Sequence, residues 1–205
     1  MIEAIILAAG ESKRMGCLKP LLRIGEKTAL AIIVEALKEA GISHTHTVVG
    51  HKSEKVIARA NTDTFFVLNE NYKNGQFSSL QCGISALSND CSAAIICLVD
   101  QPHIQSTWVE LLLQEYRKNH PLIVRLKFGS KTGHPILISK ALFSEIINAP
   151  KTLTAKDIMT KYSNQTSFVD VYSDGILYDA DTPRDFKFIQ RYITKKASED
   201  SPPDA

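Results

Sequence analysis

The chain has 205 residues, a formal net charge of +2 at pH 7, and 44% hydrophobic and 22% charged residues. This length suits one domain with a single substantial core, and the composition is that of a soluble globular protein. The small net charge provides no global field for nucleic acid or a membrane surface, so any site for anions has to be local.

The four cysteines form no C-x-x-C pair. Their pattern indicates reduced thiols and argues against a zinc site. The chain starts directly with a strand-like pattern, and no apolar run approaches the ~20 residues that cross a bilayer. We therefore expect a cytoplasmic protein that binds neither a membrane nor nucleic acid.

The first candidate site follows the apolar run from Ile2 to Leu7, which predicts a buried strand. The next segment, 8–19, combines small residues with two glycines. Small residues let the backbone approach a ligand, Gly10 can adopt a positive φ, and successive N–H groups in such a turn form an anion-binding concavity. Its cations, which can add charged hydrogen bonds to phosphate oxygens, are Lys13, Arg14 and Lys19.

This composition favours a polyphosphate site, although a plain strand-to-helix turn with a solvated basic cluster is the alternative. Two better-known phosphate loops are excluded. The spacing from Gly10 to Gly16 and the absence of Lys-Ser or Lys-Thr after it rule out a P-loop. No Gly-x-Gly-x-x-Gly follows the strand, so the dinucleotide-binding fingerprint is also missing.

The next elements alternate between helix and strand. Thr28 can cap a helix that ends at Gly41, a strand spans 45–49, a second helix spans 52–60 and a third strand spans 65–68. This alternation predicts a parallel sheet with right-handed crossovers. Ligands of such sheets bind beyond the carboxyl ends of the strands, and segment 8–19 leaves one of those ends.

The polar segment 69–83 predicts a loop that leads into a helix, with Ser78 or Ser79 as its cap. The apolar run 93–99 then predicts a central strand buried on both faces, and it ends at Asp100. A carboxylate at the carboxyl end of a central strand is placed for ligand chemistry. An ordinary helix cap at Ser79 and a turn aspartate at Asp100 are the structural alternatives.

A helix at 106–119 and a strand at 122–128 follow, and in that strand Arg125 and Lys127 alternate with apolar residues. One face of the strand is therefore expected to be exposed or to line a substrate. Gly-His-Pro at 133–135 precedes a further apolar strand, in which His134 alone is more typical of a structural turn than of a catalyst.

Helices are predicted at 140–149 and 154–162, and a strand at 166–171. Thr182 can cap a last helix with Pro183 in its first turn. Residues 194–205 have few apolar side chains to bury, so we predict a disordered tail there after a domain that spans 1–193.

Four segments in this order resemble the nucleotidyltransferases related to the molybdenum cofactor cytidylyltransferase. They are Leu-Ala-Ala-Gly-x-Ser-x-Arg-Met-Gly with a following lysine, Asn-x-x-Tyr-x-x-Gly-x-x-x-Ser-Leu-x-x-Gly, Gly-His-Pro, and Asp-x-Asp-Thr-Pro-x-Asp. The resemblance extends to about residue 192. It implies an α/β, single-domain Rossmann-like nucleotidyltransferase fold with a mostly parallel sheet and helices on both faces.

The resemblance also implies roles for particular residues. Arg14, Lys19, Asp100 and Asp181 match the catalytic positions, and the two aspartates match the ligands of Mg²⁺. A magnesium ion held by one or two carboxylates and by substrate phosphates agrees with the general preference of that ion. His134 borders the acceptor. The nucleotide-binding positions are Leu7, Ala8, Ala9, Gly10, Ser12, Arg14, Lys19, Ser79 and Asp100.

The implied reaction transfers CMP from CTP to the terminal phosphate of molybdopterin and releases pyrophosphate, with a molybdenum hydroxylase as a further candidate partner. Ala9 stands where relatives that use GTP usually have glycine, which favours CTP. Thr132 replaces the arginine that often precedes Gly-His-Pro, and Leu-Thr-Ala-Lys at 153–156 lies where many members have Gly-Asp-x-Gly-Ala-Arg. Two alternatives remain open: transfer to a sugar or alcohol phosphate, and non-catalytic delivery of the cofactor.

Overall fold

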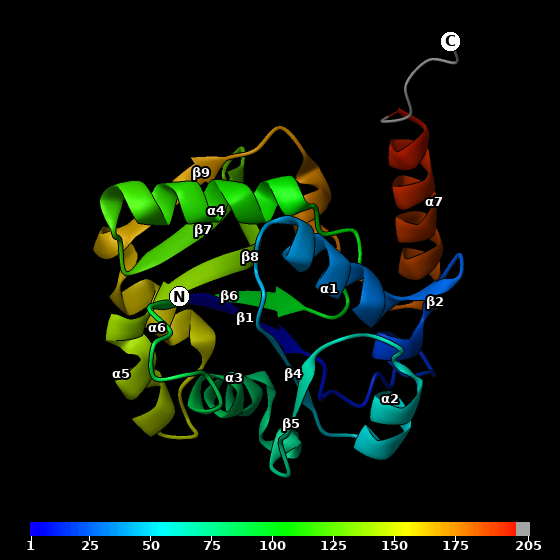
Figure 1. Cartoon of the computed structure of the whole chain (residues 1–205), viewed down its shortest axis with the longest axis horizontal. Helices are drawn as coiled ribbons and strands as arrows, with labels where there is room; N and C mark the ends of the chain where they lie inside the picture. Colours follow the sequence, from blue (N-terminus) through cyan, green and yellow to red (C-terminus); the bar gives the residue numbers. More distant parts are fainter. Residues whose placement is uncertain (200–205) are drawn as a thin grey trace.

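The computed structural model describes residues 1–199 as an α/β fold around one seven-stranded sheet (Figure 1). The order of the strands across the sheet is β5-β4-β1-β6-β8-β7-β9. Strand β8 runs antiparallel to its neighbours β6 and β7, and the other adjacent pairs are parallel. The strands are β1 (Ile2–Leu7), β4 (Thr45–Val49), β5 (Phe65–Leu68), β6 (Ala93–Leu98), β7 (Ile123–Phe128), β8 (Lys131–Ser139) and β9 (Thr166–Asp170). The predicted, mostly parallel sheet is confirmed.

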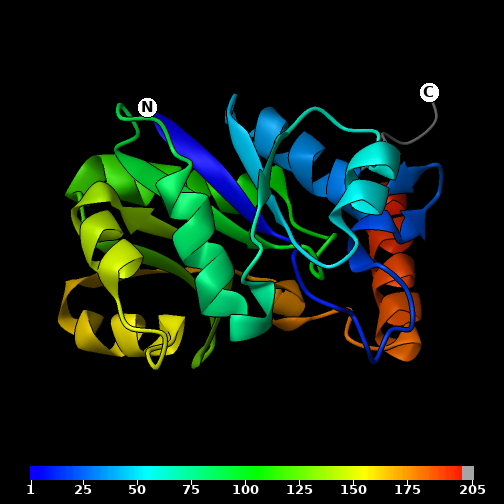
Figure 2. The same cartoon turned by 90° about the horizontal axis from the view of Figure 1, so that it is seen from below.

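Helices cover both faces of this sheet, α1 and α4 on one and α3, α5 and α6 on the other (Figures 1 and 2). The helices are α1 (Ala29–Glu39), α2 (Ser53–Arg59), α3 (Gln76–Ser85), α4 (Ser106–Asn119), α5 (Phe143–Asn148), α6 (Ala155–Lys161) and α7 (Pro183–Glu199). A small ribbon of β2 (Arg23–Ile24) and β3 (Lys27–Thr28) precedes α1. In the part of the chain described here, no helix combines the length and apolar character that a membrane crossing requires.

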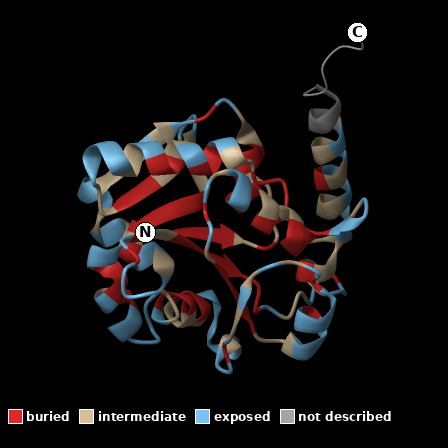
Figure 3. Ribbon diagram, viewed as in Figure 1, coloured by how far each residue is buried: buried red, intermediate tan, exposed pale blue. Residues whose placement is uncertain are grey.

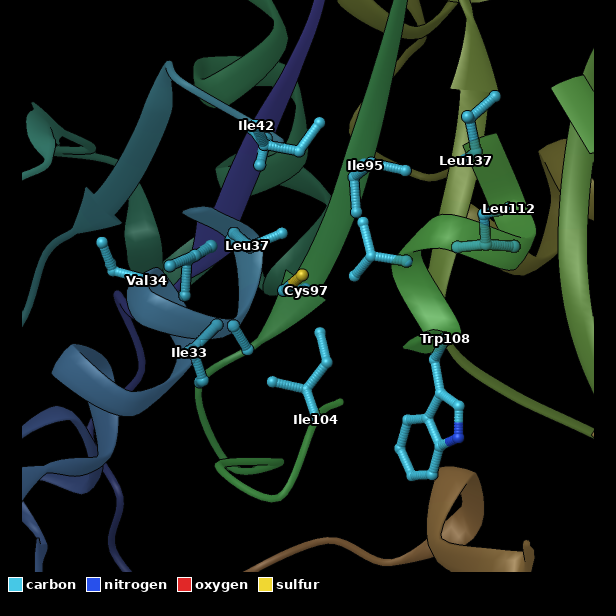
Figure 4. Close-up of a cluster of buried hydrophobic side chains, with 14 of the residues drawn as sticks. Ile33, Val34, Leu37, Ile42, Ile95, Cys97, Ile104, Trp108, Leu112 and Leu137 are labelled. Atoms are coloured by element: carbon cyan, nitrogen blue, oxygen red, sulfur yellow. The ribbon is translucent and has the colours of Figure 1, made fainter. Parts of the chain in front are cut away.

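The sheet is buried on both faces, which explains the continuous apolar runs of its central strands (Figure 3). Alternate residues of each strand point into two different cores. One core lies under α1 and α4, where Ile33, Leu37, Ile95 and Leu112 pack together (Figure 4). The second core, on the other face, contains Ile5, Ile96 and other residues beneath α3 and α5.

Local signals set the bounds of several elements as predicted. The side chain of Thr28 accepts a hydrogen bond from the backbone N–H of Ala31 and so caps α1. Gly41, at φ +84°, follows the end of that helix. Thr154, the first residue of the helix predicted at 154–162, caps α6 in a reciprocal capping box with Asp157.

The predicted cap of α3 is wrong. The helix begins at Gln76 with Gly75, at φ +97°, as its N-terminal cap, so Ser78 and Ser79 lie inside the first turns. Gly75 occupies the cap position because glycine alone adopts this positive φ without strain. The hydroxyl of Ser78 instead donates to the carbonyl of Gly75, at 2.8 Å.

Three other boundaries differ from the prediction. Strand β8 begins at Lys131, so Gly133-His134-Pro135 lies within the strand and does not precede it. The helix predicted at 140–149 is a short 3₁₀ turn followed by α5. Helix α7 continues to Glu199, beyond the predicted start of the tail at 194. The remainder of that predicted tail, 200–205, lies outside the described residues.

Candidate functional site

The segment that follows β1 is folded back on itself at the carboxyl edge of the sheet. The carbonyl of Ser12 accepts hydrogen bonds from the N–H groups of Met15 (3.0 Å) and Gly16 (3.1 Å). Ser12 and Gly16 both have positive φ, at 53° and 72°. The hydroxyl of Ser12 also accepts a hydrogen bond from the N–H of Lys19 at 3.4 Å, which closes the loop.

The start of this loop is tied to the sheet. The N–H of Ala8 donates to the carbonyl of Val48 at 2.9 Å, and the carbonyl of Ala9 accepts from the N–H of His51 at 3.1 Å. Ala8 and Ala9 are both buried. The N–H of Ala8 is therefore engaged within the sheet and is not available to a phosphate, so the anion-binding N–H groups expected in this turn do not include that of Ala8.

A cavity of about 740 Å³ opens above this edge. Its wall has four parts: the loop after β1, the segment that leads into α3, Val99 and Asp100 after β6, and Asp181 before α7. The predicted site residues that line it are Leu7, Ala8, Ala9, Gly10, Ser12, Arg14, Lys19, Ser79, Asp100 and Asp181. The structure thus brings the first, second and last sequence motifs into one cavity of a size typical for small-molecule ligands.

Lys19 joins the two predicted catalytic carboxylates. Its Nζ donates to Oδ2 of Asp100 at 2.9 Å and to Oδ1 of Asp181 at 2.7 Å. Arg14 adds an ion pair from Nη2 to Oδ2 of Asp181 at 2.9 Å. The side chain of Lys19 is only 11% exposed, whereas that of Arg14 is 71% exposed, so Lys19 is the shielded centre of this cluster.

The charges in this cluster stabilise one another. Burial opposes the charged form of Lys19, but its hydrogen bonds with Asp181 and Asp100 outweigh that effect and raise its pKa. The hydrogen bond from Lys19 lowers the pKa of Asp181. Nearby Asp179 has a raised pKa because it is buried and is repelled by Asp100 and Asp181. Lys19 and Asp181 are therefore both charged at neutral pH.

A backbone contact keeps the two halves of the site together. The N–H of Ala180 donates to the carbonyl of Asp100 at 2.8 Å. The side chain of Gln101 donates to Oδ1 of Asp179 at 2.8 Å. These bonds fix the segment before α7 against the end of β6, so that Asp181 reaches the same lysine, Lys19, as Asp100, which lies 81 positions earlier in the chain.

The two carboxylates fit a divalent cation that is also bound by substrate phosphates. Oδ1 of Asp100 is buried and has no hydrogen-bond partner among residues 1–199. The described residues contain no group of three or more His, Cys, Asp or Glu side chains that could hold a metal ion without help. Two carboxylates with additional phosphate oxygens are a usual coordination for Mg²⁺. The metal role of Asp100 and Asp181 remains a prediction.

Ser79 has a supporting partner in Asn69, the first residue of the second motif, to which the sequence analysis assigned no role. The side-chain amide of Asn69 donates to the hydroxyls of Ser79 (3.0 Å) and Ser78 (3.1 Å). Asn69 and Ser79 are buried, and Ser79 lines the cavity. Other cavity residues that were not predicted are Glu11, Pro20, Tyr72, Lys73, Gly75, Gln76 and Val99. For Tyr72, Lys73, Gly75 and Gln76, the available signal was their location within the second motif, from the end of β5 to the first residue of α3.

His134 is not among the residues that line the cavity. It is half-buried on β8, and its pKa falls to about 4 because of burial and the nearby charge of Arg125. The charge of Asp100 acts in the opposite direction. His134 is therefore neutral at pH 7 and close enough to Asp100 to be affected by it, and its predicted contact with an acceptor stays a prediction.

The family described as "MobA-like NTP transferase domain" matches residues 4–166. Nicotine blue oxidoreductase of Paenarthrobacter nicotinovorans is 29% identical over 150 residues, which cover 69% of this chain and 72% of that protein. Molybdenum cofactor cytidylyltransferase of Escherichia coli K12 is 26% identical over 189 residues, which cover 90% of this chain and 93% of that protein.

Solved structures share the fold at low sequence identity. A nucleotidyl transferase from Methanothermobacter thermautotroptrophicus superposes with a TM-score of 0.81 and 20% identity, covering 96% of this chain and 99% of that one. Rv0371C of Mycobacterium tuberculosis H37Rv, solved as a complex with manganese, has a TM-score of 0.75 and 19% identity, with 93% and 97% covered. These likenesses agree with a Rossmann-like fold across nearly the whole chain.

Proposed function

The chain belongs to the family of MobA-like NTP transferase domains and is a nucleotidyltransferase, and on this premise we propose that it transfers CMP from CTP to the terminal phosphate of molybdopterin. The observation that carries the proposal is the convergence of Lys19, Asp100 and Asp181 beside the loop after β1. The resemblance to the E. coli cytidylyltransferase, which extends over most of both chains, supports the choice of acceptor. Alanine at position 9 supports CTP.

In this proposal the residues of the chain act by positioning and by charge. The backbone around Ala9 and Gly10 approaches the triphosphate, and Arg14 and Lys19 bind phosphate oxygens through charged hydrogen bonds. The acceptor phosphate attacks the α-phosphorus in line with the departing pyrophosphate. Phosphoryl-type transfers need alignment and neutralisation of charge more than a protein nucleophile, so the proposal involves no covalent enzyme intermediate.

Asp100 and Asp181 would hold a divalent cation, which when bound neutralises charge on the transferring phosphates. The unpartnered Oδ1 of Asp100 supports this assignment, because a buried carboxylate oxygen without a donor is suited to a cation. Mg²⁺ is the proposed ion. The manganese complex of Rv0371C makes Mn²⁺ the appropriate comparison in the assay.

The test measures pyrophosphate release from CTP, GTP, ATP and UTP, each with Mg²⁺ or Mn²⁺ and with molybdenum-loaded molybdopterin. We expect turnover with CTP and its loss in Asp100→Asn. Asp63→Asn, which changes an exposed aspartate outside the cavity, is the matched control. If a sugar or alcohol phosphate supports turnover and molybdopterin does not, the proposed acceptor is wrong and that phosphate takes its place. Binding of CTP without pyrophosphate release from any acceptor would contradict the proposed transfer.

A further inference from the structure

Arg125 is half-buried, and its guanidinium has no ion-pair partner in the part of the chain that the structure describes. Its Nε is buried and lacks a hydrogen-bond partner within residues 1–199. The ion pairs in that part of the chain do not include Arg125, although Lys127, two residues later on β7, pairs with Asp170 at 3.3 Å. Arginine remains protonated even when burial lowers its pKa, as it does here. An unpaired charge in such a position is destabilising unless a ligand compensates it.

The register of the sheet places Arg125 on the same face as the candidate site. Arg125 pairs with Ile136 of β8, and Ile136 pairs with Ile96 of β6, four residues before Asp100. Directly paired residues of adjacent strands project to the same face. Ile96 and Ile136 belong to the core beneath α3 and α5, the face toward the viewer in Figure 2. Arg125 thus lies two strand spacings from β6, roughly 10 Å.

His134 lies between these two positions. The pairing of β7 with β8 is irregular after Arg125, where Leu126 pairs with Gly133, so His134 falls in the irregular stretch. The charges of both Arg125 and Asp100 influence His134. A neutral imidazole in this place can exchange hydrogen bonds with a ligand without adding a second positive charge.

We infer that Arg125 is the binding residue for an anionic group of the acceptor, a phosphate or a carboxylate, with His134 on the neighbouring strand β8. This inference rests on the proposed function, since it assumes an acceptor next to the nucleotide. A guanidinium fits such a group because its planar fork can donate two parallel hydrogen bonds to one anion. Arg125 would then orient the acceptor toward Asp100 from a position outside the nucleotide cavity.

The first test compares Arg125→Met with Lys127→Met, which removes a cation that already has a carboxylate partner on the neighbouring strand. Loss of a hydrogen bond to a charged group predicts a roughly 10- to 100-fold higher KM for the acceptor in Arg125→Met, with an unchanged Kd for CTP. Arg125→Lys should recover part of the loss. Equal effects of the Met variants, or a matching loss of CTP affinity, would overturn the inference.

The second test does not require turnover. Inorganic phosphate is titrated into the wild type and into Arg125→Gln, and the ring signals of His134 are followed by NMR. We expect a saturable change in the wild type that is at least 10-fold weaker in the variant. The same response in both proteins, or no response in the wild type, would count against the anion site. If phosphate binds as expected but molybdopterin is not a substrate, the inference stands and the proposed acceptor is wrong.

Discussion

Replacement of Lys19 by methionine tests the central contact of the candidate site. Methionine keeps the length of the side chain but removes the cation that lies 2.9 Å from Asp100 and 2.7 Å from Asp181. Breaking a fully buried pair is destabilising by about 3 to 5 kcal/mol. Here the two carboxylates are 22% and 33% exposed, and Arg14 still faces Asp181. We therefore expect a loss of about 2 kcal/mol in the free energy of unfolding at pH 7.

The pH dependence identifies the cause of this loss. The pKa of Asp181 is lowered in the folded protein, chiefly by Lys19, so its contribution to stability is present above the unfolded value of 3.8. That contribution disappears as the pH falls through the lowered folded pKa. In Lys19→Met the pKa of Asp181 rises. The difference in stability between wild type and variant should therefore be full near pH 7 and should shrink below about pH 4.

Urea unfolding followed by circular dichroism measures this difference. A loss of about 2 kcal/mol corresponds to a midpoint lower by about 1 M urea at pH 7. Lys27→Met is the control, because Lys27 is an exposed lysine that pairs with Glu35 away from the cavity, and its midpoint should not move measurably. An unchanged midpoint in Lys19→Met at pH 7, or an equal difference at pH 7 and pH 3.5, would refute the electrostatic reasoning.

Three further predictions concern packing, capping and thiol reactivity. Gly133→Ala would place Cβ 1.9 Å from the carbonyl oxygen of Ile176, and we expect a loss of at least 2 kcal/mol in unfolding free energy, measured in urea. Thr154→Ala removes the cap of α6 and should lower the unfolding free energy by about 1 kcal/mol in the same assay. In native thiol labelling by mass spectrometry, exposed Cys17 should react first, whereas Cys97, whose pKa is strongly raised by burial, should react only after unfolding.

Most elements of the fold were predictable because their signals are local. The strands at 2–7 and 45–49 and the helix at 106–119 are confirmed, since each has an uninterrupted apolar pattern of the matching period. The cap of α3 was mispredicted because serine and glycine compete at the same turn. Only the backbone conformation, with Gly75 at φ +97°, decides between them.

The contacts within the site were less predictable than its members. The sequence motifs indicated Lys19, Asp100 and Asp181 separately, as a phosphate ligand and two metal ligands. The structure adds that Lys19 contacts both aspartates, across 81 and 162 residues of chain. Arg125 was noted only for its alternation with apolar residues, because neither its burial nor its lack of a partner follows from spacing.

Packing, more than ion pairing, positions the outer half of this site. Met15, the neighbour of Arg14, belongs to the same buried hydrophobic cluster as Ala180, the neighbour of Asp181, and Ile189 of α7. The ion pair between Arg14 and Asp181 is largely exposed, and exposed pairs contribute at most about 1 kcal/mol. The apolar contact already brings the adjacent residues together, so the ion pair does not have to assemble the site. Helix α7, which begins within the last motif, is therefore part of the framework that holds the loop after β1.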